Sequence, residues 1–499
     1  MLVNVVDKDL VSIQEVRNLL NDATEAQKEL ATFSQEKIDN ICKAMMAAAY
    51  DNRIKLAKMA NEETGFGIWQ DKVVKNSFAS KAVWDSIKDM KTVGVVKDDT
   101  VNKVTDIAVP VGVVAGIIPS TNPTSTVIYK ALISIKAGNS IVFSPHPTAL
   151  KCIKETVDII RNAAVREGCP AGAISVMTKP TMQGTAELMK HDMTKLILAT
   201  GGSAMVKSAY SSGTPAIGVG PGNGPAFIEK TANISKAVKH IMDSKTFDNG
   251  TICASEQSVV VEEASRQAVV EEFKKQNAYF LTKDEAQILE KFIMRANGTM
   301  NPQIVGKSIE AISKLTGLTF PQGTRVLIAE EERVGMKVPY SREKLAPILA
   351  FYTTKTWQEA CELCIEILTN EGAGHTMVIH TEDENIVREF GLRKPVSRLL
   401  VNTPGTLGGI GASTNINPAL TLGCGAVGGS STSDNISPEN LFNVRRVAYG
   451  MRELDELRGE DINLVENSST ACSVSTPTAT SASKDDLINK IVEAVLEKL

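Results

Sequence analysis

Apolar residues in the first 90 positions recur at the three- and four-residue spacing of amphipathic helices. The segment "EKIDNICKAMMAAAYDNRIKLAKMANEET" (36–64) is one example. From about residue 107 the pattern changes to short apolar runs that alternate with stretches of helical spacing. Such alternation predicts βαβ units and a parallel sheet, so we expect an α/β fold.

Four apolar runs in this region predict strands, and the segments between them predict helices. The strands are expected at 112–119, 139–145, 173–177 and 195–200, and the helices at 125–138, 148–167, about 181–190 and from residue 203. A second alternating set runs from about residue 256 to 402 and includes "SVVVEE", "TRVLIAE", "TMVIHT" and "SRLLVN". We therefore expect a second α/β domain.

Polar and glycine-rich segments follow three of the predicted strands. They are "PSTNPTST" (119–126), "SPHPTA" (144–149) and "TGGSAMV" (200–206). Ligands of parallel sheets bind beyond the carboxyl ends of the strands, and the helix that starts after Thr200-Gly201-Gly202 would offer free N–H groups to a phosphate. "GCGAVG" (423–428) also matches G-x-G-x-x-G, but no helical pattern follows it, so we do not interpret it as a dinucleotide motif.

Composition limits the function classes. The chain has 499 residues, 43% hydrophobic content and a net charge of −4, with lysines and arginines scattered along it. These values predict two or three folded domains and no nucleic-acid partner. No secretory signal and no apolar run of membrane-spanning length is found. The eight cysteines follow no disulfide or zinc spacing, and Cys361 and Cys364 fit the core of a helix, so we expect a cytoplasmic protein without a metal site.

One cysteine differs from the others in its surroundings. Cys253 lies in "TFDNGTICASE" (246–256), where Asn249-Gly250 predicts a turn before the β-branched run 258–261. A small buried residue at a turn is one interpretation. A cysteine on a loop near the junction of two α/β domains, where clefts commonly form, is also placed to meet a substrate.

The motifs taken together resemble the CoA-acylating branch of the aldehyde dehydrogenase superfamily, which includes propionaldehyde and acetaldehyde dehydrogenases of bacterial microcompartments. The resemblance rests on "PSTNPTST", "GNSIVFSPHP", "LATGG", "FDNGTICASEQ", "KLAPIL" and "EGAGHT", in that order. It implies a Rossmann-like NAD domain (1–240), a catalytic α/β domain (241–435) and an oligomerisation arm (92–110 with 436–466). A homo-oligomer, dimer or tetramer, is expected.

The resemblance also implies roles for individual residues. Cys253 would be the nucleophile, and the Asn122 amide with the Cys253 backbone N–H would stabilise the oxyanion. Residues expected to bind NAD are Thr200, Gly201, Gly202, Ser144, His146 and Glu343; the last would contact a ribose unless it is a solvated surface charge. His375 would bind or activate CoA unless it is a core or turn histidine. Ser144 stands where hydrolytic members usually have lysine, which leaves NAD or NADP open.

The acyl acceptor follows from a missing carboxylate. Hydrolytic members carry a glutamate that activates water, whereas the matching stretch here is "GVGPGNGP" (218–225). Without a general base, water attacks a thioester poorly, so CoA is the expected acceptor. The expected reaction converts a short aliphatic aldehyde (propionaldehyde or acetaldehyde), NAD⁺ and CoA into acyl-CoA and NADH. A hydrolytic aldehyde dehydrogenase and a non-catalytic scaffold on the same fold are the alternatives.

The C-terminal segment has a different composition. Residues 467–483 are rich in serine and threonine and predict a flexible linker. "KDDLINKIVEAVLEKL" (484–499) has an apolar stripe at helical spacing and predicts an amphipathic helix. It resembles the encapsulation peptides that recruit enzymes into bacterial microcompartments, so the expected partner is a shell protein or other cargo, bound by helix-in-groove contact. Docking of the helix on its own oligomer is the alternative.

Overall fold

The computed structural model of the protein describes residues 7–454 and 456–457. Two compact units divide this part of the chain: one contains residues up to 98 together with 105–446, and the other contains 99–104 together with the residues after 446. All residues discussed below as candidate site residues belong to the first unit.

The N-terminal segment is helical, as the sequence predicts. It forms α1 (Lys8–Leu30), α2 (Gln35–Asp51), α3 (Arg53–Thr64), α4 (Trp69–Ser77) and α5 (Val83–Ile87). The side chains of Asp7 and Ser34 cap α1 and α2 by accepting backbone N–H bonds at the first turn, which is where such residues stabilise helices most. Gly65 ends α3 in the left-handed conformation.

The first parallel sheet has the strand order β5-β4-β3-β6-β7. Its first four strands in chain order confirm the predicted runs, and the short fifth strand was not predicted. The strands are β3 (Val113–Ile117), β4 (Ser140–Ser144), β5 (Ile174–Val176), β6 (Thr194–Thr200) and β7 (Ala216–Val219), and the helices are α6 (Pro123–Lys136), α7 (Leu150–Arg166), α8 (Met182–Lys190) and α9 (Ser203–Tyr210). The order reverses between β3 and β6, which makes this edge a topological switch point.

The second sheet is also parallel, with seven strands in the order β10-β11-β12-β9-β8-β13-β14. Its strands are β8 (Pro225–Ile228), β9 (Ser258–Glu262), β10 (Ala278–Phe280), β11 (Val326–Glu330), β12 (Ile348–Thr354), β13 (Gly374–His380) and β14 (Val396–Val401). Its helices are α10 (Ile234–Thr246), α11 (Glu263–Lys275), α12 (Lys283–Ile293), α13 (Ile309–Thr316), α14 (Trp357–Asn370), α15 (Glu384–Arg393) and α16 (Gly405–Gly409). The change of sheet falls between β7 and β8, upstream of the predicted border at residues 240 and 241, because β8 pairs with β9 and β13.

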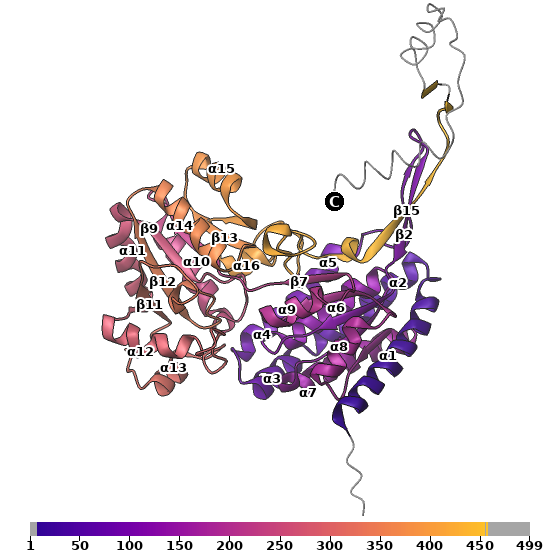
Figure 1. The fold of residues 1–499 in the computed structure, drawn as a ribbon, viewed down its shortest axis with the longest axis horizontal. Coiled ribbons are helices and arrows are strands. Elements are labelled where there is room, and N and C mark those ends of the chain that lie inside the picture. Colours follow the sequence, from indigo (N-terminus) through magenta and orange to yellow (C-terminus); the bar gives the residue numbers. More distant parts are fainter. Residues whose placement is uncertain (1–6, 455, 458–499) are drawn as a thin grey trace, which may run out of the picture. The chain divides into compact units, whose positions relative to one another are not determined.

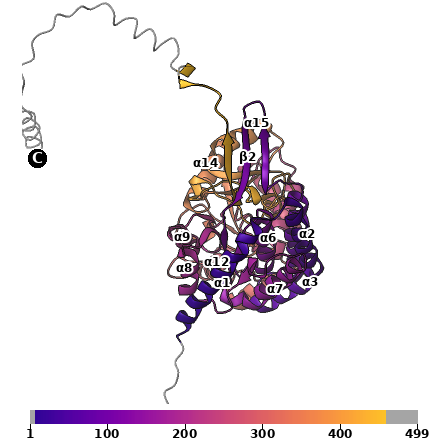
Figure 2. The same cartoon turned by 90° about the vertical axis from the view of Figure 1, so that its right-hand side faces the viewer.

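Each of the two sheets is covered by helices on both faces (Figures 1 and 2). Along β9, Val259 and Val261 pack in one cluster with residues of α10 and α11, while Val260 packs in another with residues of α12, α13 and α14. Along β6, Leu198 packs with α2, α6 and α7, whereas Ile197 and Ala199 pack with α1 and α8. Side chains of a strand alternate between its faces, so strands buried on both faces are almost continuously apolar.

A small third sheet contains β1 (Gly94–Asp99), β2 (Val104–Pro110) and β15 (Phe442–Ala448), in the order β1-β2-β15. These strands fall within the two segments predicted as the oligomerisation arm, and the oligomeric state stays a prediction. The predicted linker (467–483) and amphipathic helix (484–499) lie outside the described residues. Among the described helices, none combines the length and the apolar character that crossing a membrane requires.

Candidate active site

A cavity of about 490 Å³ opens at the carboxyl ends of β3, β4 and β6, at the switch point of the first sheet. Five residues that the sequence predicted to bind NAD line it: Ser144, His146, Thr200, Gly201 and Gly202. The structure thus brings together loops that follow three different strands. This is the place at which open α/β sheets bind nucleotides.

The donors and acceptors of this cavity fit a dinucleotide. Thr200 Oγ1 is buried and has no hydrogen-bond partner among the described residues, so a ligand hydroxyl or phosphate would satisfy it. Gly202 is the N-cap of α9 and makes no side-chain capping bond, so the first N–H groups of the helix remain available to an anion. Burial lowers the pKa of His146, so its ring is uncharged at neutral pH. Its Nδ1 accepts a hydrogen bond from Thr148 N.

The loop that carries Cys253 starts with an unusual run of backbone conformations. Asp248, Asn249 and Gly250 have φ angles of 49°, 52° and 75°. Asparagine, aspartate and glycine tolerate this left-handed region better than other residues, so the predicted Asn-Gly turn is confirmed and extended by one residue. Gly222 packs against the same loop, because a Cβ there would lie 1.9 Å from the Cys253 carbonyl oxygen. The backbone of Cys253 therefore lies directly against Gly222.

His375 contacts the Cys253 thiol directly. Its Nε2 lies 3.1 Å from Cys253 Sγ, and its Nδ1 lies 3.0 Å from Thr376 Oγ1, which accepts a bond from Arg398 Nε at 3.1 Å. A proton on Nδ1 would be shared with Thr376 and would leave Nε2 free to accept the S–H. The position on β13, with the side chain buried, excludes a turn histidine.

Burial sets the protonation of this pair. It raises the pKa of Cys253 to about 12, with a further contribution from the Glu343 charge, and it lowers the pKa of His375 to about 3, with a further contribution from Arg398. Both groups are consequently neutral at pH 7. The thiol must lose its proton before it can attack, and His375 Nε2 is placed at hydrogen-bond distance to accept that proton.

Asn122 stands at the N-terminus of α6, where the chain leaves β3. Its Nδ2 donates to Thr251 O at 3.2 Å, so its amide N–H group is directed at the loop of Cys253. Its Oδ1 accepts from Lys75 Nζ at 2.5 Å. The oxyanion role predicted from the sequence requires an amide donor facing the nucleophile loop, and this orientation fits that role.

A buried ionic cluster behind Asn122 was not recognised in the sequence. Lys72 and Lys75 both lie on α4 and donate to Asp248 Oδ2, at 2.9 and 2.5 Å. All three side chains are at most 3% exposed. The spacing "DKVVK" places the two lysines three residues apart on one helix face, but a sequence alone favours solvent for such charges.

Glu343 is buried, so it is not a solvated surface charge. Its Oε1 accepts from Gly222 N at 2.8 Å, which brings a carboxyl group to the stretch 218–225 that has none of its own. Burial and the neighbouring Glu371 raise the pKa of Glu343 to about 8. At neutral pH the group is mainly protonated and is a poor base. Its predicted contact with a ribose stays a prediction.

Other motifs of the sequence have structural places. Cys361 and Cys364 are buried on α14, as predicted for helix core residues. The "GCGAVG" segment itself ends in a single 3₁₀ turn, Ala426–Gly428, so it does not form the start of a nucleotide-binding helix. Among the described residues, no group of three or more His, Cys, Asp or Glu side chains could hold a metal ion.

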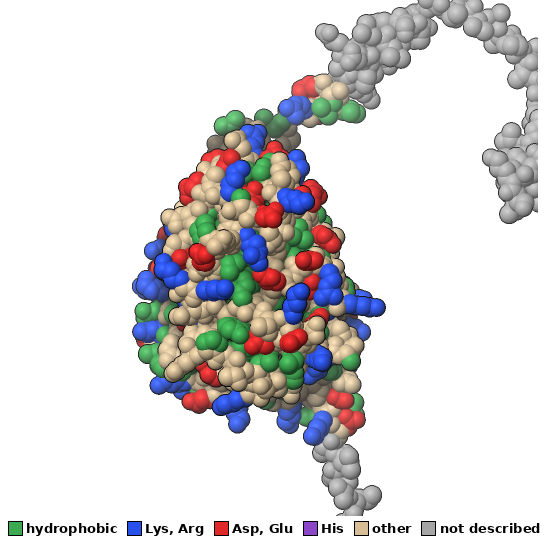
Figure 3. Space-filling model, turned by 90° about the vertical axis from the view of Figure 1, so that its left-hand side faces the viewer, with side chains coloured by type: hydrophobic (Ala, Val, Ile, Leu, Met, Phe, Trp, Pro, Cys, Tyr) green, Lys and Arg blue, Asp and Glu red, His purple; other side chains and the backbone are tan. Residues whose placement is uncertain are grey.

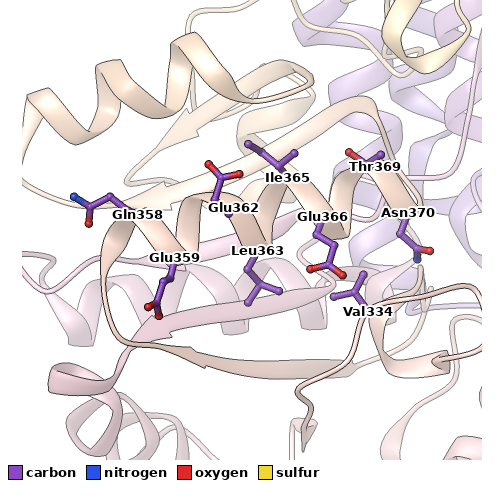
Figure 4. Close-up of a pocket in the computed structure, with 9 residues that line it drawn as sticks. All are labelled: Val334, Gln358, Glu359, Glu362, Leu363, Ile365, Glu366, Thr369 and Asn370. Atoms are coloured by element: carbon purple, nitrogen blue, oxygen red, sulfur yellow. The ribbon is translucent and has the colours of Figure 1, made fainter.

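A second hollow, of about 920 Å³, runs along α14 (Figure 4). Three carboxylates line it, those of Glu359, Glu362 and Glu366, so it disfavours anionic nucleotides. None of the predicted site residues lies there. Elsewhere, on the face drawn in Figure 3, basic and acidic side chains are interspersed.

Comparison with known proteins places these features in a family. The family described as "Aldehyde dehydrogenase family" matches residues 7–415. The bifunctional aldehyde-alcohol dehydrogenase AdhE of Escherichia coli K12 is 45% identical over 445 residues, which is 88% of this chain and 50% of that protein. This chain spans about half the length of the bifunctional relatives. The succinate-semialdehyde dehydrogenase (acetylating) of Clostridium kluyveri is 38% identical over 88% of this chain and 96% of its own length.

Solved structures give the same assignment. A probable aldehyde dehydrogenase of Listeria monocytogenes EGD-e is 72% identical, with a TM-score of 0.90 over 91% of this chain and 100% of that one. An acetylating aldehyde dehydrogenase of Geobacillus thermoglucosidasius is 54% identical, with a TM-score of 0.89 over 90% and 99%.

More distant structures carry more specific descriptions. A propionaldehyde dehydrogenase from a fucose utilisation microcompartment of Clostridium phytofermentans is 27% identical, with a TM-score of 0.79 over 87% of this chain and 97% of that one. A propionaldehyde dehydrogenase of Rhodopseudomonas palustris, solved with bound CoA and an acylated cysteine, is 26% identical, with a TM-score of 0.78 over 87% and 97%. From the family match and from relatives covered over nearly their whole length, the chain belongs to the aldehyde dehydrogenase family.

Proposed function

We propose that the protein is a CoA-acylating aldehyde dehydrogenase, which converts an aldehyde, NAD⁺ and CoA into acyl-CoA, NADH and a proton through a thioester on Cys253. The observation that carries the proposal is the pairing of Cys253 Sγ with His375 Nε2 at 3.1 Å, on a loop that also binds the Asn122 amide. A nucleophile, a base and an oxyanion donor are the parts that acyl transfer needs.

In the first step, His375 removes the thiol proton as Cys253 Sγ attacks the aldehyde carbon. The carbonyl oxygen gains negative charge, and the amide N–H of Asn122 with the backbone N–H of Cys253 stabilises it. NAD⁺ held in the cavity at β3, β4 and β6 would accept the hydride that the former aldehyde carbon loses, which converts the hemithioacetal on Cys253 into the thioester. Residues Thr200, Gly201 and Gly202 would hold its pyrophosphate side by backbone N–H groups and the free Thr200 hydroxyl.

In the second step, the acyl group leaves Cys253 for an incoming thiol. His375, once it has passed its first proton to solvent, accepts the proton of the CoA thiol as the CoA sulfur attacks the thioester carbon. The bond between that carbon and Cys253 Sγ then breaks, and the Cys253 thiolate takes the proton back from His375. Water competes poorly because the carboxyl group of Glu343, which contacts the stretch 218–225 at Gly222, is mainly protonated at neutral pH. The CoA and acylated cysteine described for the Rhodopseudomonas palustris relative support this order of events.

The substrate and setting belong to the same proposal. A short aliphatic aldehyde, propionaldehyde or acetaldehyde, is the proposed substrate, and a bacterial microcompartment is the proposed location. The Clostridium phytofermentans relative, whose description names such a compartment, supports both. We assign residues 1–240, 241–435 and 436–466 to NAD binding, catalysis and oligomerisation; β8, near the end of the first range, already belongs to the second sheet.

Formation of NADH from propionaldehyde and NAD⁺, measured with and without CoA, tests the reaction. We expect turnover that requires CoA and yields propionyl-CoA. Equal turnover without CoA would instead assign the hydrolytic reaction. Absence of NADH in both cases, with several aldehydes, would leave only a non-catalytic protein.

Removal of residues 467–499 tests the proposed targeting segment. The shortened enzyme should keep its turnover and no longer co-purify with microcompartment shells. A fluorescent protein fused to residues 484–499 should co-purify with the shells. Shell association of the shortened enzyme would contradict the proposal.

Light scattering of the same samples checks the expected dimer or tetramer.

A further inference from the structure

We propose that Lys75 is a positioning residue, which acts on the reaction by fixing and polarising the amide of Asn122. The inference rests on the proposed function, because it assigns Lys75 a role only if Asn122 stabilises the oxyanion. What it adds is a residue from α4, about 180 positions before the nucleophile in the chain.

An asparagine side chain can bind in two orientations that exchange its oxygen and its nitrogen. Only one of them directs N–H groups at an oxyanion; the other directs a carbonyl oxygen at it, which repels the developing charge. Lys75 removes this ambiguity. An ammonium group is a donor without any acceptor, so its contact of 2.5 Å with Asn122 requires the amide oxygen on that side and leaves Nδ2 on the side of Thr251.

The surroundings of Lys75 fix its position. Its Nζ makes three contacts: with Asn122 Oδ1 at 2.5 Å, with Asp248 Oδ2 at 2.5 Å and with Thr251 Oγ1 at 3.0 Å. The side chain is only 2% exposed. Because an ammonium carries three N–H groups, all three are used, and no water needs to complete the shell. The group therefore cannot swing away from Asn122 without breaking two other buried bonds.

Asp248 ties this group to the catalytic loop. It precedes Cys253 by five residues, and its Oδ1 accepts from Ile68 N at 2.6 Å while its Oδ2 binds Lys72 and Lys75. The backbone N–H of Asp248 donates to Asp71 Oδ2 at 2.7 Å. The start of α4 and the nucleophile loop thus share one buried network, which sets the position of the Asn122 amide relative to the loop.

The charge of Lys75 also strengthens the donor. An ammonium bound to the amide oxygen draws electron density from the amide nitrogen, and hydrogen bonds in such a chain reinforce one another at low dielectric. Nδ2 now donates to Thr251 O and to Thr121 Oγ1, both at 3.2 Å. These long bonds to neutral acceptors are weaker than a bond to an oxyanion, so the amide can give one of them up when the charge develops.

A double-mutant cycle between Lys75→Met and Asn122→Ala tests the inference. The readout is the NADH burst from propionaldehyde and NAD⁺ without CoA, which reports thioester formation and is independent of the acceptor. Asn122→Ala should slow the burst by roughly 10²–10³-fold, the loss measured for one oxyanion donor. Lys75→Met should slow it by roughly 10–100-fold at saturating aldehyde, with little change in the aldehyde concentration for half-maximal rate.

The decisive comparison is the effect of Lys75→Met in the Asn122→Ala background. A residue that acts only through the amide should then cost less than about 2-fold. Lys72→Met is the matched control, because Lys72 shares Asp248 and α4 but contacts Thr121 O instead of the amide. Its effect should be smaller and the same in both backgrounds. Lys75→Gln, which keeps an uncharged donor, should retain more activity than Lys75→Met and replaces it in the cycle if that variant does not fold.

Each outcome is decisive. An equal loss from Lys75→Met with and without the Asn122 amide would overturn the inference, since a purely structural effect persists in both backgrounds. The inference would also be overturned if Lys72→Met slowed the burst as much as Lys75→Met does and if that effect also disappeared in the Asn122→Ala background. A wild-type burst with no CoA-dependent turnover would refute the proposed acceptor and leave the role of Lys75 intact. A wild-type enzyme without a burst would overturn both.

Discussion

Replacement of His375 by alanine isolates the step in which the thiol loses its proton. In the structure, His375 Nε2 lies 3.1 Å from Cys253 Sγ, and no second base is hydrogen-bonded to this sulfur among the described residues. The substitution leaves the thiol in a buried site where its pKa is about 12. Attack on the aldehyde would then depend on hydroxide from solvent.

The size of the effect follows from these values. With a pKa of about 12, only about one thiol in 10⁵ is ionised at pH 7. A positioned general base contributes about 10²–10⁴-fold, or roughly 2.7–5.5 kcal/mol of barrier. We expect His375→Ala to slow thioester formation by a factor in that range. It should not weaken NADH binding, because His375 does not line the cavity at β3, β4 and β6.

The pH dependence gives a sharper test than the rate alone. Since the pKa of His375 is about 3 and that of Cys253 about 12, the wild-type burst rate should be flat from roughly pH 5.5 to 7.5. The alanine variant should speed up about tenfold for each pH unit, because its rate follows the thiolate fraction. Stopped-flow measurement of NADH absorbance without CoA records both profiles.

His380→Gln is the matched control, since His380 is a buried histidine on the same strand and has no contact with Cys253. It should keep the wild-type rate and the flat profile. A flat profile for His375→Ala would refute the assignment of His375 as the base.

Three further predictions concern the same site. Cys253→Ala should abolish turnover and retain NADH binding by fluorescence, whereas Cys152→Ala should leave turnover largely intact; substantial activity of the first variant would exclude the nucleophile. Gly220→Glu should raise CoA-independent hydrolysis of the acyl-enzyme, and the position can accept a side chain because a Cβ there has no neighbour within 4 Å. A Cβ at Gly218 would instead meet Val206 at 2.7 Å and should destabilise the fold. An unchanged rate of hydrolysis in a folded Gly220→Glu enzyme would contradict this prediction. Glu343, with a pKa of about 8, gains its charge above that pH and raises the pKa of Cys253, so wild-type kcat at saturating NAD⁺ should fall above pH 8 and Glu343→Gln should not show this fall.

Much of the scaffold could be predicted from the sequence because its strands are buried on both faces. Runs such as 195–200 are almost continuously apolar and are bounded by turn residues, so both their type and their limits are visible. The strands of the two parallel sheets that were missed, β7, β8, β10 and β12, are short or follow glycine or proline. Their pairing with distant partners, such as β8 with β13, is a tertiary property that no local pattern carries.

Site residues at the ends of strands of one sheet could be predicted from the sequence. Site residues that depend on contacts between segments distant in the chain could not. Ser144 and Thr200 end strands of one sheet and Gly202 follows shortly after, so topology brought them together as expected. The contact of Glu343 with Gly222 joins segments 121 residues apart, so no local pattern could predict it. It shows that the stretch 218–225, which has no carboxylate of its own, has a carboxyl group from elsewhere in the chain beside it. Lys75 was missed because a buried ammonium is rare and becomes stable only with a carboxylate such as Asp248, whose position depends on a left-handed turn.

The central claim is that Cys253 carries the acyl group and passes it to CoA. Mass spectrometry of the enzyme mixed with propionaldehyde and NAD⁺, but without CoA, tests it most directly. We expect a mass increase of one propionyl group, mapped to the peptide of Cys253, that persists in buffer and is discharged as propionyl-CoA when CoA is added. An adduct on another residue, or an adduct that water releases as fast as CoA does, would contradict the account.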